Sequence, residues 1–352
     1  MLHDWNINKD RVTLVPRDSG ANMVKGMRLA ELPDLSCTAH SLQLVVNDGL
    51  SSQRAVTDII AIIKKCATHF HHSILAKQRL KDIQKNLGLP QYNLVQAVPT
   101  RWNSTLHMLQ RALEQKHALN IYAGEHGGFA YPIAYQWDIV SNLVETLIPI
   151  EEVTLEVSSN SASASCIIPC LAVLKMLLQD GGPSTQGIGT LMQAMRESLI
   201  KCFSKLEDMK SVVLACLLDP CYKNHAFSSD ITLSKAKEWL NEDVESAAKQ
   251  SSQQEHAATE EAIMEVTAAE VVSDEEEAAA EESGTHESDR RTTKRQRRED
   301  EETSCIHRID EMFSSLPGPH TGEPLAKVSL DDELQLYLKE PVIDRRKEDP
   351  LQ

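Results

Sequence analysis

Hydrophobic residues recur every three or four positions over most of the first 240 residues, which is the spacing of a helix face that packs against a core. The longest stretch of this pattern runs from Gln53 to Leu80 and predicts one long helix. Further helices are predicted around residues 106–113, 137–157, 167–178 and 188–206, with Gly181-Gly182-Pro183 separating the last two. The pattern therefore predicts a protein that is mostly helical.

Two short apolar runs, Val12–Val15 and Leu94–Val98, instead predict buried β-strands. Asp18 follows the first run, and the chain then turns toward a helix that opens near residues 21–24. A carboxylate at the end of a strand is well placed for chemistry, because the strand is rigid and the loops beside it are open to a ligand. The ordinary alternative is that Asp18 only caps the next helix.

Two polar motifs lie at the starts of predicted helices. Cys37 and His40 are three residues apart, so they share one face of a helix. Pro99 disfavours a helix just before Thr100, which can act as the N-cap of the helix that carries Arg101-Trp102.

Taken in this order, three motifs resemble those of the hAT superfamily of DNA transposases, and most closely its domesticated branch with BED-type zinc fingers. The motifs are Asp18-Ser19-Gly20-Ala21-Asn22-Met23, Cys37-Thr38-Ala39-His40-Ser41-Leu42 and Thr100-Arg101-Trp102-Asn103-Ser104-Thr105. Two further segments match as well, Leu214–Lys223 and Glu333–Leu338 with Glu340-Pro341. The resemblance covers about residues 1–240 and 325–352.

The resemblance implies an α/β but predominantly helical fold, in which an all-helical insertion interrupts the remnant of an RNase H-like core. We expect the core part at residues 1–105 and the helical insertion at 106–240. Residues 241–304 are rich in Ala, Glu, Ser and Gln and are predicted to form a disordered acidic linker. Residues 305–352 would begin a C-terminal region, with a short amphipathic helix near 328–337. The BED finger and the C-terminal dimerisation region are expected to be absent from this chain.

Transposases of this superfamily cut and join DNA with two metal ions held by three carboxylates. By resemblance, Asp18 corresponds to the second of these carboxylates. The seventeen residues before it are too few for the strand that would carry the first, and the third belongs to the C-terminal region. We therefore expect Asp18 to be vestigial and to hold Mg²⁺ only weakly, and we expect neither enzyme activity nor a cofactor in this chain.

The Arg-Trp motif has a different role in the superfamily, where the tryptophan stacks on a base displaced from the duplex. An indole stacks on any base, for about 1–3 kcal/mol, and a neighbouring guanidinium can hold phosphate. The resemblance thus assigns Arg101, Trp102, Cys37 and His40 to nucleic-acid binding. Two alternatives remain open: Trp102 can pack beneath its own helix, and Cys37 and His40 can simply form a half-buried helix face.

The net charge of −16 is unevenly distributed along the chain. Residues 251–289 hold 13 Asp/Glu and no Lys/Arg, which leaves −3 for the remainder. Residues 1–120 hold 15 Lys/Arg against 9 Asp/Glu, as a surface that faces phosphate would. An ordinary solvated surface is the alternative. A basic cluster of Lys294, Arg295, Arg297 and Arg298 is typical of a nuclear localisation signal.

Eight cysteines are scattered without a Cys-x2-Cys pair, so no zinc finger or disulfide framework is indicated. The chain shows no signal peptide and no apolar run of transmembrane length, which favours a reducing compartment and no membrane partner. A Cys66-x2-His69 pattern with His71 and His72 suggests a metal site, but the apolar face of the helix already explains Cys66.

Three functional hypotheses follow. The first is a domesticated or degenerate transposase-like nuclear protein that binds DNA or regulates, without catalysis, and that meets the nuclear import machinery and protein partners or a second copy. The second is an active transposase, should the complete gene supply the other carboxylates. The third is a helical interaction scaffold with no DNA role. Open sheet edges also predict poor solubility of the isolated chain.

Overall fold

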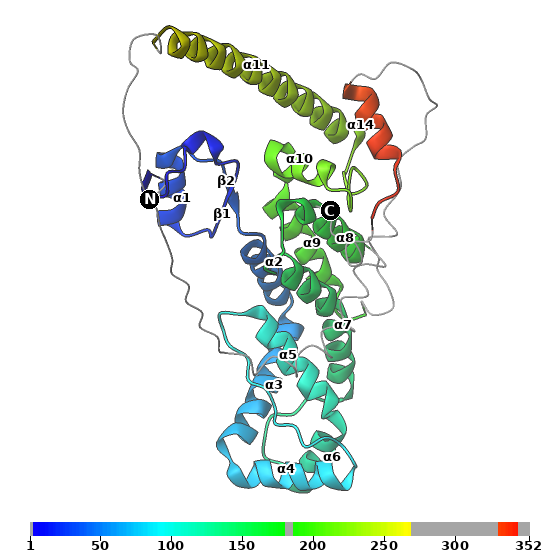
Figure 1. Cartoon of the computed structure of the whole chain (residues 1–352). Helices are drawn as coiled ribbons and strands as arrows, with labels where there is room; N and C mark the ends of the chain where they lie inside the picture. Colours follow the sequence, from blue (N-terminus) through cyan, green and yellow to red (C-terminus); the bar gives the residue numbers. More distant parts are fainter. Residues whose placement is uncertain (1–2, 180–185, 269–329, 344–352) are drawn as a thin grey trace, which may run out of the picture.

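Helices dominate the computed structural model, which describes residues 3–179, 186–268 and 330–343 (Figure 1). The N-terminal part contains β1 (Val15–Arg17), α1 (Ala21–Ala30) and β2 (Asp34–Ser36). The long helices are α2 (Thr38–Ser52), α3 (Arg54–His72), α4 (Ile74–Asn86), α5 (Trp102–Glu114), α6 (Lys116–His126), α7 (Ala134–Glu156), α8 (Ile167–Gln179), α9 (Gly189–Phe203), α10 (Lys210–Leu218), α11 (Asp230–Ala268) and α14 (Leu330–Lys339). Short 3-10 turns are η1 (His3–Trp5), η2 (Lys9–Arg11), η3 (Ala164–Cys166) and η5 (Leu206–Asp208).

The periodic apolar positions form the core, as the sequence predicts. On α3 the buried residues are Val56, Ile59, Ile60, Ile63, Cys66, Ala67 and Phe70, all on one helix face. Each large apolar side chain of this kind contributes about 1.5–3 kcal/mol to folding through burial. The predicted single helix over 53–80 is wrong in one respect, because it breaks at Ser73. The Ser73 hydroxyl accepts a hydrogen bond of 3.1 Å from the Ala76 N–H and so caps α4.

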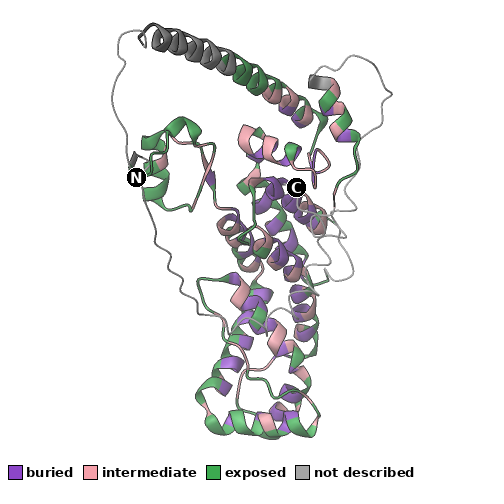
Figure 2. Cartoon of the chain, in the orientation of Figure 1, coloured by how far each residue is buried: buried purple, intermediate pink, exposed green. Residues whose placement is uncertain are grey.

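One hydrophobic core runs through the helices on both sides of residue 105. It joins Leu42 of α2, Leu106 of α5, Leu143 of α7, Leu174 of α8 and Leu191 of α9. Figure 2 shows this buried column through the middle of the molecule. The predicted boundary between residues 1–105 and 106–240 stays a prediction, but packing is continuous across it.

The closest helix pairing is that of α2 with α9, and it depends on a glycine. Gly49 faces Met195, and a Cβ built at position 49 would lie only 2.1 Å from Met195 Cγ. The Ser198 hydroxyl of α9 also donates a hydrogen bond of 2.7 Å to Asp48 of α2. The small residue therefore lets two helices that are distant in sequence approach closely.

The predicted strands are only partly correct. The first strand, β1, begins at Val15 rather than Val12, and it pairs in parallel with β2, which the sequence pattern did not indicate. Residues 94–98 form no strand: Leu94 and Ala97 pack against the core, and no neighbouring strand is available to them. β1 and β2 are the two strands of the described residues, and an RNase H-like sheet is not established by them.

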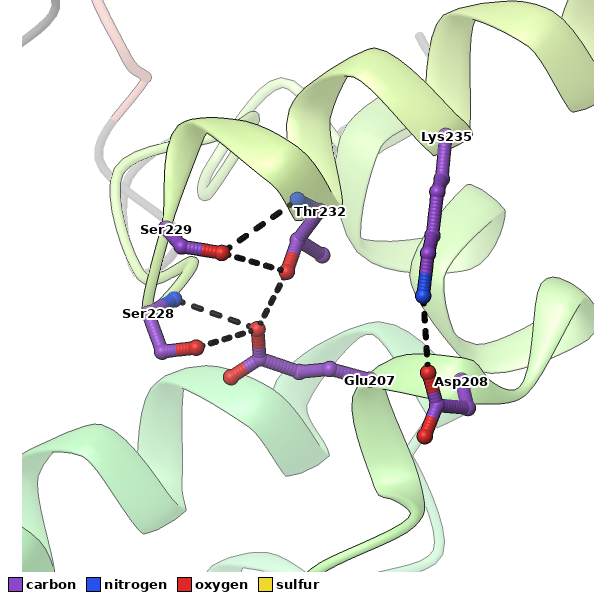
Figure 3. Close-up of polar contacts among 6 residues, drawn as sticks. All are labelled: Glu207, Asp208, Ser228, Ser229, Thr232 and Lys235. Atoms are coloured by element: carbon purple, nitrogen blue, oxygen red, sulfur yellow. Dashed lines mark hydrogen bonds and ion pairs between the residues drawn. The ribbon is translucent and has the colours of Figure 1, made fainter.

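The expected disorder from residue 241 is wrong for the first part of that segment, because α11 continues to Ala268. Its Ala, Glu, Lys and Gln content explains this, since these residues favour helix strongly. The start of α11 is also anchored. Glu207 accepts hydrogen bonds from Ser228 and Thr232, and Lys235 pairs with Asp208 at 2.9 Å (Figure 3). Residues 269–304, and with them Lys294, Arg295, Arg297 and Arg298, lie outside the described residues.

The predicted short helix near 328–337 is confirmed as α14, which ends before Pro341. Its buried side chains Leu334 and Leu338 pack against the core. Lys223, at the end of the Leu214–Lys223 motif, donates hydrogen bonds to backbone carbonyls at the C-terminal end of α14. Two of the motifs that carried the resemblance therefore meet in space.

Candidate nucleic-acid interface

A single side chain connects two of the predicted site motifs. The Oε1 atom of Gln43, on α2, accepts a hydrogen bond of 3.1 Å from the backbone N–H of Trp102, the first residue of α5. The first N–H groups of a helix have no partner within the helix, so Gln43 supplies one from outside. His40 lies one helical turn before Gln43 on the same face of α2. The start of α5 is thereby held beside the first turns of α2.

Arg101 is exposed and its backbone is firmly held. The residue is the N-cap of α5, one position later than the predicted Thr100, and its carbonyl accepts a hydrogen bond of 2.6 Å from the Ser104 hydroxyl. Its own N–H donates a hydrogen bond of 3.1 Å to the Val98 carbonyl, as in a turn. Among the described residues no carboxylate pairs with its guanidinium. The cation is therefore positioned by the backbone and open to an external anion.

Trp102 lies in the hydrophobic core, with 3% of its surface exposed. The side chain belongs to the same core cluster as Leu106. This agrees with the alternative in which Trp102 packs beneath its own helix. Its indole N–H finds no acceptor among the described residues. Stacking on a base would require the indole to leave this position, so that role stays a prediction. In the present structure Trp102 anchors the start of α5 on which Arg101 sits.

Cys37 and His40 are both half-buried at the start of α2. Cys37 is the N-cap of the helix, and its N–H donates a hydrogen bond of 2.6 Å to the Arg17 carbonyl. This bond links α2 to β1. The two residues are thus on the same helix end as predicted, and Gln43, three residues after His40, connects this helix to the start of α5.

Asp18 occupies an exposed turn directly after β1, as predicted. Its Oδ1 atom accepts a hydrogen bond of 2.9 Å from the Gly20 N–H, which stabilises the turn into α1. The nearest strand carboxylate, Asp34, is engaged with Arg17. The described residues hold no group of three His, Cys, Asp or Glu suited to a metal ion. The residues present around Asp18 therefore do not fit a two-metal centre, and its weak Mg²⁺ role stays a prediction.

Cys66 and His69, whose spacing suggested a metal site, make packing contacts instead. Burial raises the pKa of the Cys66 thiol to about 12, which disfavours the thiolate that a metal needs. His69 stacks on Phe129 with ring centroids 4.9 Å apart, and its Nε2 lies 3.2 Å from the Tyr122 hydroxyl. These contacts form an aromatic cluster between α3 and α6.

A polar network beside the site was not predicted from the sequence. Glu151 of α7 accepts a hydrogen bond of 2.8 Å from the Asn103 side chain and lies 2.7 Å from His107 Nε2. Asn103 and His107 are four residues apart, so both reach the same carboxylate from one face of α5. The four-residue spacing of Asn103 and His107 indicates that they can share a partner, but the sequence does not identify Glu151 of α7 as that partner.

Residues 35–145 match the family model described as the ZBED1 RNase-like helical domain, a range that includes Cys37, His40, Arg101 and Trp102. The chain is 30% identical over 210 residues to zinc finger BED domain-containing protein 4 of Homo sapiens, covering 60% of this chain and 18% of that protein. It is 27% identical over 242 residues to zinc finger BED domain-containing protein 6 of Homo sapiens, covering 66% of this chain and 25% of that protein.

The same extent and identity hold for zinc finger BED domain-containing protein 6 of Mus musculus. The chain thus spans a quarter or less of the length of these curated relatives. The mostly helical fold of residues 35–145 agrees with the description of the family model as a helical domain. The chain is therefore similar to the BED-type zinc finger proteins, and its residues 35–145 resemble the RNase-like helical domain of that group.

Proposed function

We propose that this chain is a transposase-derived nuclear protein that binds DNA in a regulatory or interaction role, without an intact catalytic site. The observation that carries the proposal is the hydrogen bond between Gln43 and Trp102, which sets the exposed Arg101 beside the start of α2. The excess of Lys/Arg over Asp/Glu in residues 1–120, 15 against 9, supports it. Nuclear import would depend on the basic cluster at Lys294–Arg298.

The chemistry of the proposed interface is phosphate binding. A guanidinium presents its N–H donors in a fixed plane and can engage a phosphate through two hydrogen bonds. Because the backbone of Arg101 is held at both its N–H and its carbonyl, less conformational freedom is lost when the side chain binds. Cys37 and His40 would border the same contact. A remnant of an RNase H-like core around β1 and β2 would lie at the N-terminal end of α2, where the Cys37 N–H bonds to the Arg17 carbonyl of β1.

The proposal excludes catalysis on the ground of donor chemistry. Asp18 is exposed and bonded to its own turn, and Asp34 is engaged with Arg17. A two-metal site needs several carboxylates directed at one point. Metal-dependent nicking of DNA by the full chain, abolished by Asp18→Ala, would overturn this part of the proposal.

The direct test is DNA binding by the full chain, measured by fluorescence anisotropy with labelled duplex over a range of salt. Arg101→Gln is expected to weaken binding several-fold and to reduce the salt slope by about 1, because one phosphate contact is lost. Arg196→Gln serves as the matched control, since Arg196 is also exposed but lies on α9. Absence of DNA binding by the unaltered chain would refute the proposal.

The burial of Trp102 favours a second candidate, a helical interaction scaffold without a DNA role. If the chain is such a scaffold, Trp102→Ala should unfold the domain, and Arg101→Gln should leave the binding of any ligand unchanged. On the DNA-binding proposal, Arg101→Gln reduces affinity while the thermal unfolding of the protein is unchanged. The two variants measured together therefore separate the candidates.

A further inference from the structure

A row of lysines follows one face of α4. Lys77, Lys81 and Lys85 are spaced four residues apart, and two of them are exposed while Lys81 is half-buried. With a rise of about 1.5 Å per residue, successive members lie about 6 Å apart along the helix axis. The row therefore places three positive charges over about 12 Å on one side of a helix.

Among the described residues, no Asp or Glu side chain forms an ion pair with Lys77, Lys81 or Lys85. Asp82 is the one acidic residue of α4, and its Oδ1 accepts a hydrogen bond of 3.1 Å from Gln78. Asp58, the one acidic residue of α3, pairs with Arg54 at 3.7 Å. Like charges four residues apart destabilise a helix, so an uncompensated row has a cost that an external anion would relieve.

The buried face of α4, which adjoins the row, fixes it in place. Ala76, Leu80 and Ile83 are buried, and Gln84 donates a hydrogen bond of 2.8 Å to Gln115 at the start of α6. The helix lies at one end of the elongated molecule, whereas the acidic helix α11 lies at the other (Figure 1). The row is thus a rigid basic surface, distant from the strongly acidic helix.

We propose that Lys77, Lys81 and Lys85 form a second contact with the backbone of duplex DNA, independent of base sequence. The inference rests on the proposed function, since it extends the DNA-binding surface beyond Arg101. Each strand of a duplex carries a phosphate per about 3.4 Å of helix axis, so a row of about 12 Å spans three or four phosphates. A membrane surface fits less well, because the apolar face that such a helix would insert is packed in the core.

The experiment compares the full chain with the triple variant Lys77→Gln/Lys81→Gln/Lys85→Gln in duplex binding between about 50 and 200 mM NaCl. We expect the slope of log K against log salt to fall in magnitude by about 2–3, and affinity to fall at least about tenfold. The control Arg196→Gln/Lys201→Gln/Lys205→Gln removes the same charge from exposed positions in and just after α9 and should change neither value strongly. Glutamine keeps the helix propensity of lysine, and circular dichroism verifies folding.

The outcomes separate this inference from the proposed function. If the unaltered chain binds no DNA, both fail. If it binds and Arg101→Gln weakens binding while the α4 triple variant behaves like its control, the proposed function stands and the lysine row is not a DNA contact. Loss of binding to phosphatidylserine vesicles with unchanged DNA binding would likewise overturn the inference and assign the row to a membrane surface.

Discussion

The ammonium group of Lys223 donates a hydrogen bond of 2.5 Å to the backbone carbonyl of Tyr337, 114 residues further along the chain. A second bond of 2.8 Å goes to the carbonyl of Glu340, and the ammonium lies 4.4 Å from the centre of the Tyr337 ring. The last carbonyls of a helix lack N–H partners and carry partial negative charge. Lys223 thus caps α14 from another part of the fold. Because the ammonium is desolvated there, its pKa is lowered.

Replacing Lys223 by methionine should release α14. The variant nearly keeps the length of the side chain but removes the ammonium donor from both carbonyls, of which the Tyr337 carbonyl keeps a bond of 3.3 Å from the Glu340 N–H. We expect a cost of about 1–3 kcal/mol. Hydrogen–deuterium exchange of residues 334–340 should rise sharply. Lys339→Met, an exposed position on the same helix, is the control and should leave exchange unchanged. Equal protection in the two variants would show that α14 is held by its leucines alone.

Gly49→Ala should disrupt the pairing of α2 with α9. The added methyl group would overlap Met195, so we expect a loss of about 1–3 kcal/mol, reduced if the methionine side chain moves aside. Gly124→Ala, in α6, meets no atom within 4 Å and should instead stabilise the protein by about 0.5–1 kcal/mol. Urea unfolding followed by circular dichroism measures both. A neutral Gly49→Ala variant would refute the close contact.

Glu207→Ala should loosen the start of α11. The carboxylate accepts bonds of 2.7 Å from the Ser228 hydroxyl and 2.8 Å from the Thr232 hydroxyl, beside the positive end of the helix (Figure 3). Loss of these bonds should cost about 1–2 kcal/mol and expose the segment to limited proteolysis. Glu238→Ala, at an exposed position further along α11, should not change the cleavage rate. Identical digestion of both variants would contradict the anchor.

The buried thiol of Cys66 should make the protein less stable in alkali. Its pKa is raised from 9.0 to about 12 in the folded state, so between these values the unfolded chain has lost the proton and the folded chain keeps it. This contribution to stability is complete below pH 9.0 and is lost as the pH rises toward about 12. The free energy of unfolding should therefore decline with pH, and Cys66→Ala should decline less steeply by about 1.4 kcal/mol per pH unit.

Thiol labelling gives an independent reading of the same burial. Exposed Cys202 should react with iodoacetamide at mildly alkaline pH, whereas Cys66 should react only after unfolding. Mass spectrometry of the alkylated peptides distinguishes the two sites. Rapid labelling of Cys66 in the folded protein would show that the apolar face of α3 is accessible to solvent.

The sequence by itself determined most of the helices. The apolar spacing around Ile59, Ile63 and Phe70 is a local pattern that repeats with the period of a helix, so any compact arrangement must bury that face. The short amphipathic segment around Leu334 and Leu338 was predicted for the same reason. The break at Ser73 was missed because a hydroxyl cap inside a continuous apolar pattern leaves little trace in the spacing of hydrophobic residues.

Only the tertiary structure decided what the polar and aromatic residues contact. Sequence spacing placed Trp102 at a helix start, but its burial depends on α2, which supplies the Gln43 contact from 59 residues away. The segments of Lys223 and Tyr337 were singled out by their resemblance to the superfamily, which does not indicate that one caps the other. Helix formation depends on neighbours within a few residues, whereas these contacts depend on how whole helices pack, and that packing is set by the core as a whole.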